Sequence, residues 1–320
     1  MAVNGEIQID ALLPSEMAAK AERIGVKKAR LNPVSVFVLA VLAGAFIALG
    51  AVFSTTVVAG AGSVLPFGVT RLLAGVVFSL GLILVVIGGA ELFTGNNLIV
   101  MAWAHHTVTT RLLLKNWVIV YTGNFVGALI TVLIVFLSGQ YQFGSGAVGA
   151  AALSTANAKM GYDFLQAMAL GIMCNALVCL AVWLTYSART VSDKILAIVP
   201  PITAFVAAGF EHSIANMYFV PMGLLIRAGA PQSFWTAIGK TAADYGNLTW
   251  DRFLINNLLP VTIGNIIGGA LMVGAVYWFV YLRPHATELA ANGAVKLEAF
   301  NAPVEAVPVP VEVMSEPRQS

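Results

Sequence analysis

Two stretches of this sequence decide its fold: GGAELFTGN at residues 88–96 and GFEHSIANM at residues 209–217. Each stretch places a carboxylate and an asparagine within a long apolar run. The positions that match, at one constant separation along the chain, are Gly89, Glu91 and Asn96 in the first stretch and Gly209, Glu211 and Asn216 in the second. A repeat of this kind indicates a duplicated fold in which both copies contain the same interruption.

The apolar runs around these stretches are long enough to cross a membrane. Of 320 residues, 59% are hydrophobic and 10% are charged, whereas about a quarter of the residues of a soluble domain are charged. A spanning helix requires roughly 20 apolar residues. Uncharged runs that each contain one such span lie within residues 31–70, 72–90, 116–158, 164–188 and 253–282. The sequence therefore predicts an all-α membrane protein.

The segment between Lys194 and Arg227 holds a further span, but Glu211 and His212 divide it into two short apolar pieces. As one straight helix it would be about 48 Å long, which exceeds a hydrocarbon core of about 30 Å. A broken helix fits this length better. The second span has the same form, because Glu91 interrupts an apolar run that continues beyond it. We expect six spans, with the second and fifth broken at the membrane centre.

A second repeat lies downstream of each break. The pattern Gly-Asn-x-x-Gly occurs at residues 123–127 and again at residues 264–268. Glycines at this spacing let two helix backbones approach closely within a membrane. Each half then has three spans, and because three is odd, the second half is inverted relative to the first. The predicted architecture is an inverted 3+3 repeat.

The breaks predict a polar cavity at the membrane centre. Backbone groups freed by a break are tolerated only inside protein or beside water, and the positive ends of the helices that restart there favour an anion. His212 places a titratable donor at this depth, where an ionisable group is functional by default. Thr94 supplies a hydroxyl from the opposite break. We expect a conducting path for anions through the bundle.

Apolar residues near the breaks are candidates for constrictions of this path. Phe205 lies seven residues before His212, which on a continuous helix puts both side chains on one face, and Phe78 and Leu82 form an i, i+4 pair before the first break. Ordinary packing explains the same spacing. Asn175 is an amide inside the fourth span and is either a pore residue or a hydrogen-bond partner between helices.

Glu91 and Glu211 are interpreted as structural residues. Carboxylates beside a broken helix can accept hydrogen bonds from the backbone amides that the break frees. Gly89 and Gly209 belong to the same structural group at the breaks. In this interpretation these four residues shape the path and do not conduct.

The sequence offers no cofactor site, no metal site and no catalytic set. Cys174 and Cys179 lie in one apolar run at a spacing that turns them about 140° away from each other on a helix. The histidines form no cluster of metal ligands, and Phe234 stands where a phosphate-binding loop at residues 234–241 requires its first glycine. A net charge of +2 indicates no nucleic-acid partner. We expect neither an enzyme nor an ATP-driven pump; a membrane scaffold subunit without transport stays an alternative.

The distribution of basic residues predicts how the chain is oriented. Placing both termini in the cytoplasm puts most Lys and Arg residues near helix ends inside, with Lys159 outside. Residues 1–30 are expected to form a cytoplasmic amphipathic helix that lies on the anionic inner leaflet, with Met17, Ala21 and Ile24 on one stripe. Residues 31–283 form the six-span channel domain, and residues 284–320 form a disordered cytoplasmic tail.

Three segments of the chain resemble the formate/nitrite transporter family, and in particular its formate channels: GGAELFTGN (88–96), GFEHSIANMYFVPMG (209–223) and VTIGNIIGG (261–269). The resemblance extends from about Ala11 to Arg283. It implies an aquaporin-like fold, assembled as a homopentamer with one pore per subunit in the bacterial inner membrane. The chain has no Asn-Pro-Ala pair, which disfavours conduction of water or glycerol.

The resemblance also implies roles for individual residues. His212 is the central switch, Thr94 lies on a mobile loop after the first break, and Lys159 and Asn175 lie at the outer vestibule and in the pore. The constriction residues that the resemblance implies are Phe78, Leu82, Phe93 and Phe205.

Formate and similar small monovalent anions are the substrates that the resemblance implies. Phenylalanine at both Phe78 and Phe205 favours the formate branch of the family. Nitrite and hydrosulfide stay alternatives, because the branches that transport them share the Glu and His elements. Two modes of transport are also open, a passive channel and a proton-coupled carrier.

Overall fold

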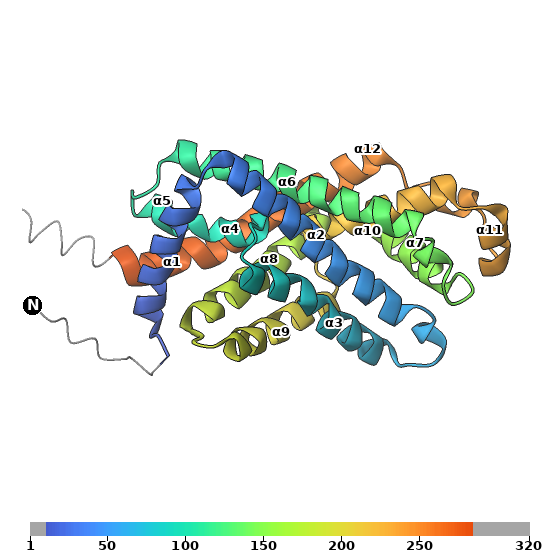
Figure 1. The fold of residues 1–320 in the computed structure, drawn as a ribbon, viewed down its shortest axis with the longest axis horizontal. Coiled ribbons are helices and arrows are strands. Elements are labelled where there is room, and N and C mark those ends of the chain that lie inside the picture. Colours follow the sequence, from blue (N-terminus) through green and yellow to red (C-terminus); the bar gives the residue numbers. More distant parts are fainter. Residues whose placement is uncertain (1–10, 284–320) are drawn as a thin grey trace, which may run out of the picture.

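The computed structural model describes residues 11–283, and every regular element in this range is a helix (Figure 1). Six segments are long and apolar enough to cross a membrane. They are α2 (Pro33–Val58), α3 (Phe67–Gly88), α6 (Thr110–Leu137), α8 (Phe164–Ser187), α9 (Val191–Ala208) and the C-terminal segment Ala242–Leu282. The predicted all-α membrane protein with six spans is confirmed. The tail expected over residues 284–320 lies outside the described residues.

The sixth span is a helix whose turns are widened in three places. It consists of α12 (Trp250–Arg252) and α13 (Leu259–Ile266), with π-helical stretches at Phe253–Leu258, Ile267–Ala275 and Trp278–Leu282. π-helical stretches are rare in proteins, and those that occur often lie near functional sites. The first of them carries Asn257, which is fully buried.

Shorter helices lie at the two ends of the bundle (Figure 1). α1 (Pro14–Arg30) and α5 (Val100–Ala104) lie at one end, and α7 (Ala147–Lys159) and α11 (Gln232–Ile238) at the other. Single 3₁₀ turns occur at Ala61–Ser63, Asn97–Ile99, Gln140–Gln142 and Ala242–Tyr245. α7 lies in the run for which only one span was expected, because glycines with positive φ at residues 139, 144 and 146 reverse the chain after α6.

The second and fifth spans are broken, as the sequence predicts. α3 ends at Gly88 and α9 at Ala208, and the residues that follow, Gly89 and Gly209, have φ of +80° and +79°. Glycine takes this left-handed conformation without steric cost and commonly ends helices in this way. Helices restart as α4 (Phe93–Asn96) and α10 (Ser213–Gly229).

Glycines bring the helices of each half into backbone contact. A Cβ added at Gly127 on α6 would lie 1.9 Å from the Val41 carbonyl oxygen on α2. A Cβ added at Gly268 in the sixth span would lie 2.1 Å from the Ile172 carbonyl oxygen on α8. Because no side chain fits in such a gap, the Gly-Asn-x-x-Gly pattern makes the same close helix contact in both halves.

α3 and α9 cross near the centre of the molecule (Figure 1). The crossing is close, because a Cβ added at Gly75 on α3 would lie 2.7 Å from the Thr203 carbonyl oxygen on α9. The crossing places the ring of Phe78 against that of Phe205, with centroids 5.7 Å apart. The two broken spans therefore present their apolar residues to each other beside the breaks.

α1 packs on the bundle through the stripe expected from the sequence. Met17 and Ala21 are buried, and Ile24 packs against the same apolar cluster, which includes Trp183 and Tyr277. The stripe therefore faces protein, and this corrects the expectation that it faces the lipid leaflet. The physical reason is that removing an apolar stripe from water lowers the free energy whether protein or lipid covers it. Here α5, α8 and the end of the sixth span provide the covering surface.

Candidate functional site

Two cavities open at opposite ends of the bundle and reach toward the breaks. We call the cavity at the end that carries α1 the inner cavity; it has a volume of 530 Å³ and is lined by α1, α2, α3, α8, α9 and the first break. The outer cavity, at the end that carries α7, has a volume of 400 Å³ and is lined by α2, α3, α7, α9, α10 and the second break. The two cavities share no lining residue. The side chains between them therefore close the path.

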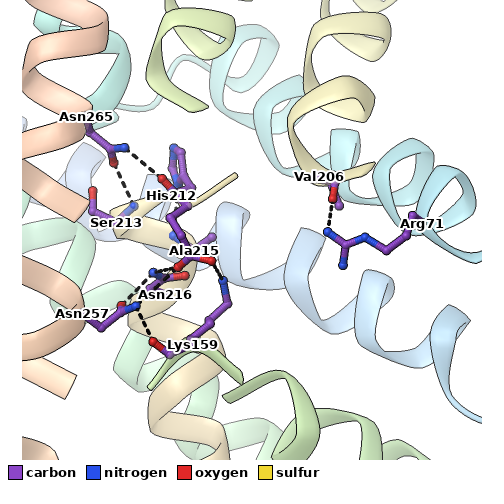
Figure 2. Close-up of polar contacts among 10 residues, drawn as sticks. Arg71, Lys159, Val206, His212, Ser213, Ala215, Asn216, Asn257 and Asn265 are labelled. Carbon is purple, nitrogen blue, oxygen red and sulfur yellow. Dashed lines mark hydrogen bonds and ion pairs between the residues drawn. The ribbon is translucent and has the colours of Figure 1, made fainter. Parts of the chain in front are cut away.

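The outer cavity contains an ion pair built into the second break (Figure 2). Lys159 Nζ lies 2.7 Å from Glu211 Oε1, and the exposed fractions of the two side chains are 12% and 2%. Asn216 Nδ2 donates to Glu211 Oε2 at 2.7 Å and to Asn257 Oδ1 at 2.8 Å. Asn257 Nδ2 donates to the Lys159 carbonyl oxygen at 3.1 Å. The burial of both charges is tolerated because each is paired and hydrogen-bonded.

The inner cavity contains the same arrangement at the first break. Lys28 Nζ lies 2.9 Å from Glu91 Oε1. Asn96 Nδ2 donates to Glu91 Oε2 at 2.7 Å and to Asn116 Oδ1 at 2.9 Å, and Asn116 Nδ2 donates to the Lys28 carbonyl oxygen at 3.3 Å. Lys28 lies within the predicted N-terminal amphipathic helix (residues 1–30) and was not identified as a site residue. The structure places it in the polar network of the first break.

An asparagine from the Gly-Asn-x-x-Gly pattern holds the first break in place. Asn124 Oδ1 accepts a hydrogen bond from the Phe93 amide, the first of α4, at 2.9 Å. Its Nδ2 donates to the carbonyl oxygens of Ala40 and Glu91 at 2.7 Å and 2.9 Å. One side chain therefore satisfies three backbone groups that the broken helix and its neighbour leave open.

Asn265 holds the second break through the same three bonds. Its Oδ1 accepts from the Ser213 amide at 2.9 Å (Figure 2). Its Nδ2 donates to the carbonyl oxygens of Gly171 and Glu211 at 2.8 Å and 3.0 Å. The first amides of α4 and α10, those of Phe93 and Ser213, thus bond to asparagine. This corrects the expectation that Glu91 and Glu211 accept those amides; the two carboxylates hold the ion pairs instead.

His212 and Thr94 meet at the closure between the cavities. His212 Nε2 lies 3.0 Å from Thr94 Oγ1, across the two breaks. His212 is also the N-terminal cap of α10, because its Nδ1 accepts the Ala215 amide at 3.0 Å. An Nδ1 that accepts an N–H carries no proton, so the neutral ring carries its proton on Nε2 and donates it to the Thr94 hydroxyl. Both residues that the sequence places at the centre are brought together.

Aromatic rings line the outer side of the closure. The His212 ring stacks on Phe205 with centroids 5.8 Å apart, and Phe205 packs edge-on against Phe78. All three residues line the outer cavity. The expected reason for this proximity was wrong, because α9 ends at Ala208 and no single helix carries Phe205 and His212. The stack forms across the break.

The inner side of the closure is aliphatic. Leu82 lines the inner cavity, as expected for a constriction residue. Phe93, expected to be a constriction, lines neither the inner nor the outer cavity, and its ring packs against Trp117 and Tyr121 at centroid distances of 6.0 Å and 4.9 Å. Leu92, one residue earlier, lines the inner cavity instead. The chain is extended at Leu92, so successive side chains point to opposite sides.

Asn175 lies beside the closure without lining either cavity. It is fully buried, and its Nδ2 donates to the Asn265 carbonyl oxygen at 2.7 Å and to the Thr94 carbonyl oxygen at 3.3 Å. Of the two roles left open by the sequence, these contacts favour the hydrogen-bond partner between helices. Asn175 thereby supports the backbone that carries the Thr94 hydroxyl.

Titratable groups at the cavity mouths have shifted pKa values. Burial, and then the charges of Lys194, Arg189 and Arg23, lower the pKa of Lys20 at the inner cavity. Burial and the Glu211 carboxylate raise the pKa of Tyr162 at the outer cavity. The inner mouth is thus crowded with cations, and the phenol of Tyr162 stays a hydrogen-bond donor.

No cluster of metal ligands occurs within residues 11–283. Cys174 and Cys179 are buried free thiols.

Three features of the site were missed from the sequence. The Lys28–Glu91 pair joins residues far apart in the chain, and nothing local to either residue indicates the other. The caps formed by Asn124 were detectable in part, because the same asparagine recurs between two glycines in the other half of the sequence. Arg71, which lines the outer cavity, lies between two predicted spans and was not identified as a site residue.

A family model and individual relatives of known name point to the same family. The family model described as formate/nitrite transporter matches residues 15–279. The formate channel FocA of Escherichia coli strain K12 is 50% identical over 274 residues, covering 86% of this chain and 96% of the relative. The formate channel FocA of Haemophilus influenzae is 43% identical, covering 85% and 95%.

Solved structures agree with these sequences. A pentameric formate channel with formate bound has a TM-score of 0.75 at 48% identity, covering 78% of this chain and 98% of the other. An FNT family ion channel has a TM-score of 0.69 at 28% identity, covering 83% and 99%. With a family match over most of its length and relatives of this identity, the chain belongs to the formate/nitrite transporter family.

Proposed function

We propose that this chain forms a channel for formate and similar small monovalent anions across the bacterial inner membrane. The proposal is supported by relatives that are formate channels and by a structural neighbour solved with formate bound. The observation in this chain that carries it is the Thr94–His212 hydrogen bond, which lies between two cavities that open at opposite ends of a membrane-spanning bundle.

An anion that crosses this path must lose most of its water. The desolvation of an isolated charge in an apolar medium costs many kcal/mol unless the charge is paired or hydrogen-bonded. α10 begins at the closure, and its positive end lowers this cost by about 1 kcal/mol or less at an exposed terminus and somewhat more when buried. A direct donor is therefore needed, and the His212 N–H is placed to provide it.

The hydrogen bonds of His212 define what the ring gives to an anion. A formate oxygen that displaces the Thr94 hydroxyl accepts the Nε2 proton in a hydrogen bond. The neutral ring cannot transfer this proton, because its loss would leave an imidazolate. Protonation at Nδ1 would place two N–H donors against each other, since Nδ1 accepts the Ala215 amide. These contacts support passage of formate as a hydrogen-bonded anion.

Selection by size is assigned to the two apolar layers. Phe78 and Phe205 close the outer side, and Leu82 and Leu92 close the inner side. An apolar constriction gates by excluding water and bulky solutes, and opens only when side chains move. Since Leu92 directly precedes the first turn of α4, movement of the Thr94 backbone also moves this side chain.

Assembly and orientation complete the proposal. By likeness to the pentameric neighbour, the chain forms a homopentamer in which each subunit has its own path. Both termini are placed in the cytoplasm, so the inner cavity with its lysines faces the cytoplasm. The inverted 3+3 repeat is supported by the matching networks around Glu91 and Glu211.

The test is uptake by liposomes that contain the purified protein. Formate, nitrite, lactate and hydrosulfide are compared as tracers, with and without a pH gradient, and native mass spectrometry gives the number of subunits. We expect formate to be taken up fastest, down its gradient and without need of a proton gradient. Faster uptake of nitrite or hydrosulfide would assign the chain to another branch, and no uptake of any anion would support the scaffold alternative.

A further inference from the structure

The charges that line the outer cavity do not sum to zero. Apart from the titratable His212, its charged lining residues are Arg71, Lys159 and Glu211. Lys159 and Glu211 form a close pair and act together as a dipole, whose field falls off faster than that of a single charge. The net positive charge of this cavity therefore resides on Arg71.

Arg71 has neutral partners only. Its Nε donates to the Ala207 carbonyl oxygen at 3.2 Å, and its Nη2 donates to the Val206 carbonyl oxygen (Figure 2). Among the described residues 11–283 no carboxylate forms an ion pair with the Arg71 guanidinium. A cation at the C-terminal end of a helix is stabilised by the helix dipole, which explains why it is tolerated there.

The same two bonds attach Arg71 to the constriction. Val206 and Ala207 directly follow Phe205 in the last turn of α9, and Gly209 lies beside the guanidinium, because a Cβ added there would be 3.3 Å from Nη2. Arg71 comes from α3, the helix that also carries Phe78. One side chain thus ties the end of α9 to α3 at the level of the two rings.

We propose that Arg71, and not Lys159, is the residue that captures anions in the outer cavity, and that the same guanidinium positions Phe205. The inference rests on the proposed anion channel. Lys159, which the family resemblance places at the outer vestibule, does not fill this role, because its charge is cancelled at 2.7 Å by Glu211. Removing Lys159 alone would expose a buried carboxylate and so reduce flux for a different reason.

The first experiment measures capture through its dependence on salt. Tracer formate uptake from the outer side is followed between about 10 mM and 150 mM inert salt, over which the screening length falls from about 30 Å to about 8 Å. Wild-type uptake should fall as salt rises. Arg71→Gln should lower uptake by about tenfold at low salt and leave it nearly independent of salt, since a charge that focuses ions changes arrival rates by about this factor or more.

Two controls separate charge from structure. Arg227→Gln removes a guanidinium that also donates to backbone carbonyls, those of Ala242 and Leu248, but that does not line the outer cavity. This variant should keep the salt dependence of the wild type. The double variant Lys159→Gln with Glu211→Gln leaves the net charge unchanged and should also keep that dependence, whatever its absolute flux.

Positioning has its own readout. Arg71→Lys keeps the charge but cannot bridge two adjacent carbonyls in the same way, because it lacks the planar fork. It should therefore keep the salt dependence and raise the ratio of lactate to formate uptake, as a loosened Phe205 admits larger solutes. A ratio equal to that of the wild type would remove the positioning role.

A chemical probe changes the charge at position 71 after the protein has folded. Arg71→Cys is modified with a cationic or with an anionic methanethiosulfonate reagent, and Cys174 and Cys179 are buried and give little background. The cationic adduct should restore uptake at low salt and the anionic adduct should suppress it. If both adducts act alike, or if Arg71→Gln keeps the wild-type salt dependence, the proposal is wrong. If wild-type protein takes up no formate, the proposed function fails instead.

Discussion

At the scale of single residues, the imidazole of His212 has two separable jobs. Its Nδ1 caps α10 by accepting the Ala215 amide, and its Nε2 faces Thr94 at the closure. A cap contributes about 1 kcal/mol to stability and can be supplied by asparagine as well as by histidine. The Nε2 N–H acts in transport, because it can donate a hydrogen bond to the passing anion. Substitutions that keep one job and remove the other can therefore distinguish them.

His212→Phe should remove both jobs, whereas His212→Asn should keep the cap and offer an amide N–H as donor. We expect His212→Phe to unfold at lower temperature than wild type, by a cost of about 1 kcal/mol, and to lose formate flux by about tenfold or more, because the desolvated anion has no donor at the closure. His212→Asn should keep the stability and more of the flux than His212→Phe. The measurements are thermal unfolding in detergent and formate flux in liposomes. Wild-type formate flux in His212→Phe would show that the histidine is structural only.

Neighbouring residues Leu92 and Phe93 should respond differently to truncation. Leu92→Ala opens the inner constriction and should raise lactate uptake relative to formate, as should Phe205→Ala on the outer side. Phe93→Ala should instead leave that ratio unchanged and destabilise the protein by about 3–5 kcal/mol, because its ring is packed against Trp117 and Tyr121. Uptake ratios and thermal unfolding in detergent check both. An altered ratio of lactate to formate uptake in Phe93→Ala would show that this ring is part of the conducting path.

At the scale of elements, each break depends on one asparagine from another helix. Asn124→Leu leaves the Phe93 amide and two carbonyl groups without their partner in a buried site, at about 1–3 kcal/mol for each such group. We expect faster amide hydrogen exchange confined to the first break for Asn124→Leu, and to the second break for Asn265→Leu. Asn32→Ala is the matched control, since Asn32 caps α2 at an exposed end and its loss should cost about 1 kcal/mol. Equal exchange at both breaks in either variant would contradict this assignment.

The sequence allowed the breaks to be placed but not the groups that stabilise them. Gly89 and Gly209 mark the ends of α3 and α9 because positive φ suits glycine, and this is a local property that a sequence displays. The partners of Glu91 and Glu211 come from helices far away in the chain, so only the folded structure brings them together. Phe93 was assigned to the path by the family resemblance. Leu92 lines the inner cavity instead, because a shift of one residue in an extended segment reverses the side on which a side chain lies.

At the scale of the whole molecule, the two halves carry the same polar network in different surroundings. Lys159 is more deeply buried than Lys28, with exposed fractions of 12% and 27%. Breaking a buried ion pair by removing one partner costs about 3–5 kcal/mol, and the cost should be smaller where water reaches the remaining charge. Lys159→Gln should therefore lower the unfolding temperature more than Lys28→Gln. Restoration of the unfolding temperature by adding Glu211→Gln to Lys159→Gln is the confirming result, and the reverse order of the single variants would disprove it.

The caps of the two restarted helices differ in a way that gives the path a direction. Leu92 occupies the first position before α4, and His212 occupies the same position before α10. An anion from the outer side thus meets a hydrogen-bond donor before the aliphatic layer, whereas one from the inner side meets the aliphatic layer first. A passive path cannot pump, so both directions must balance when the electrochemical potentials are equal. The asymmetry can still make the two directions of flux saturate differently. Half-maximal influx and half-maximal efflux are then reached at different anion concentrations.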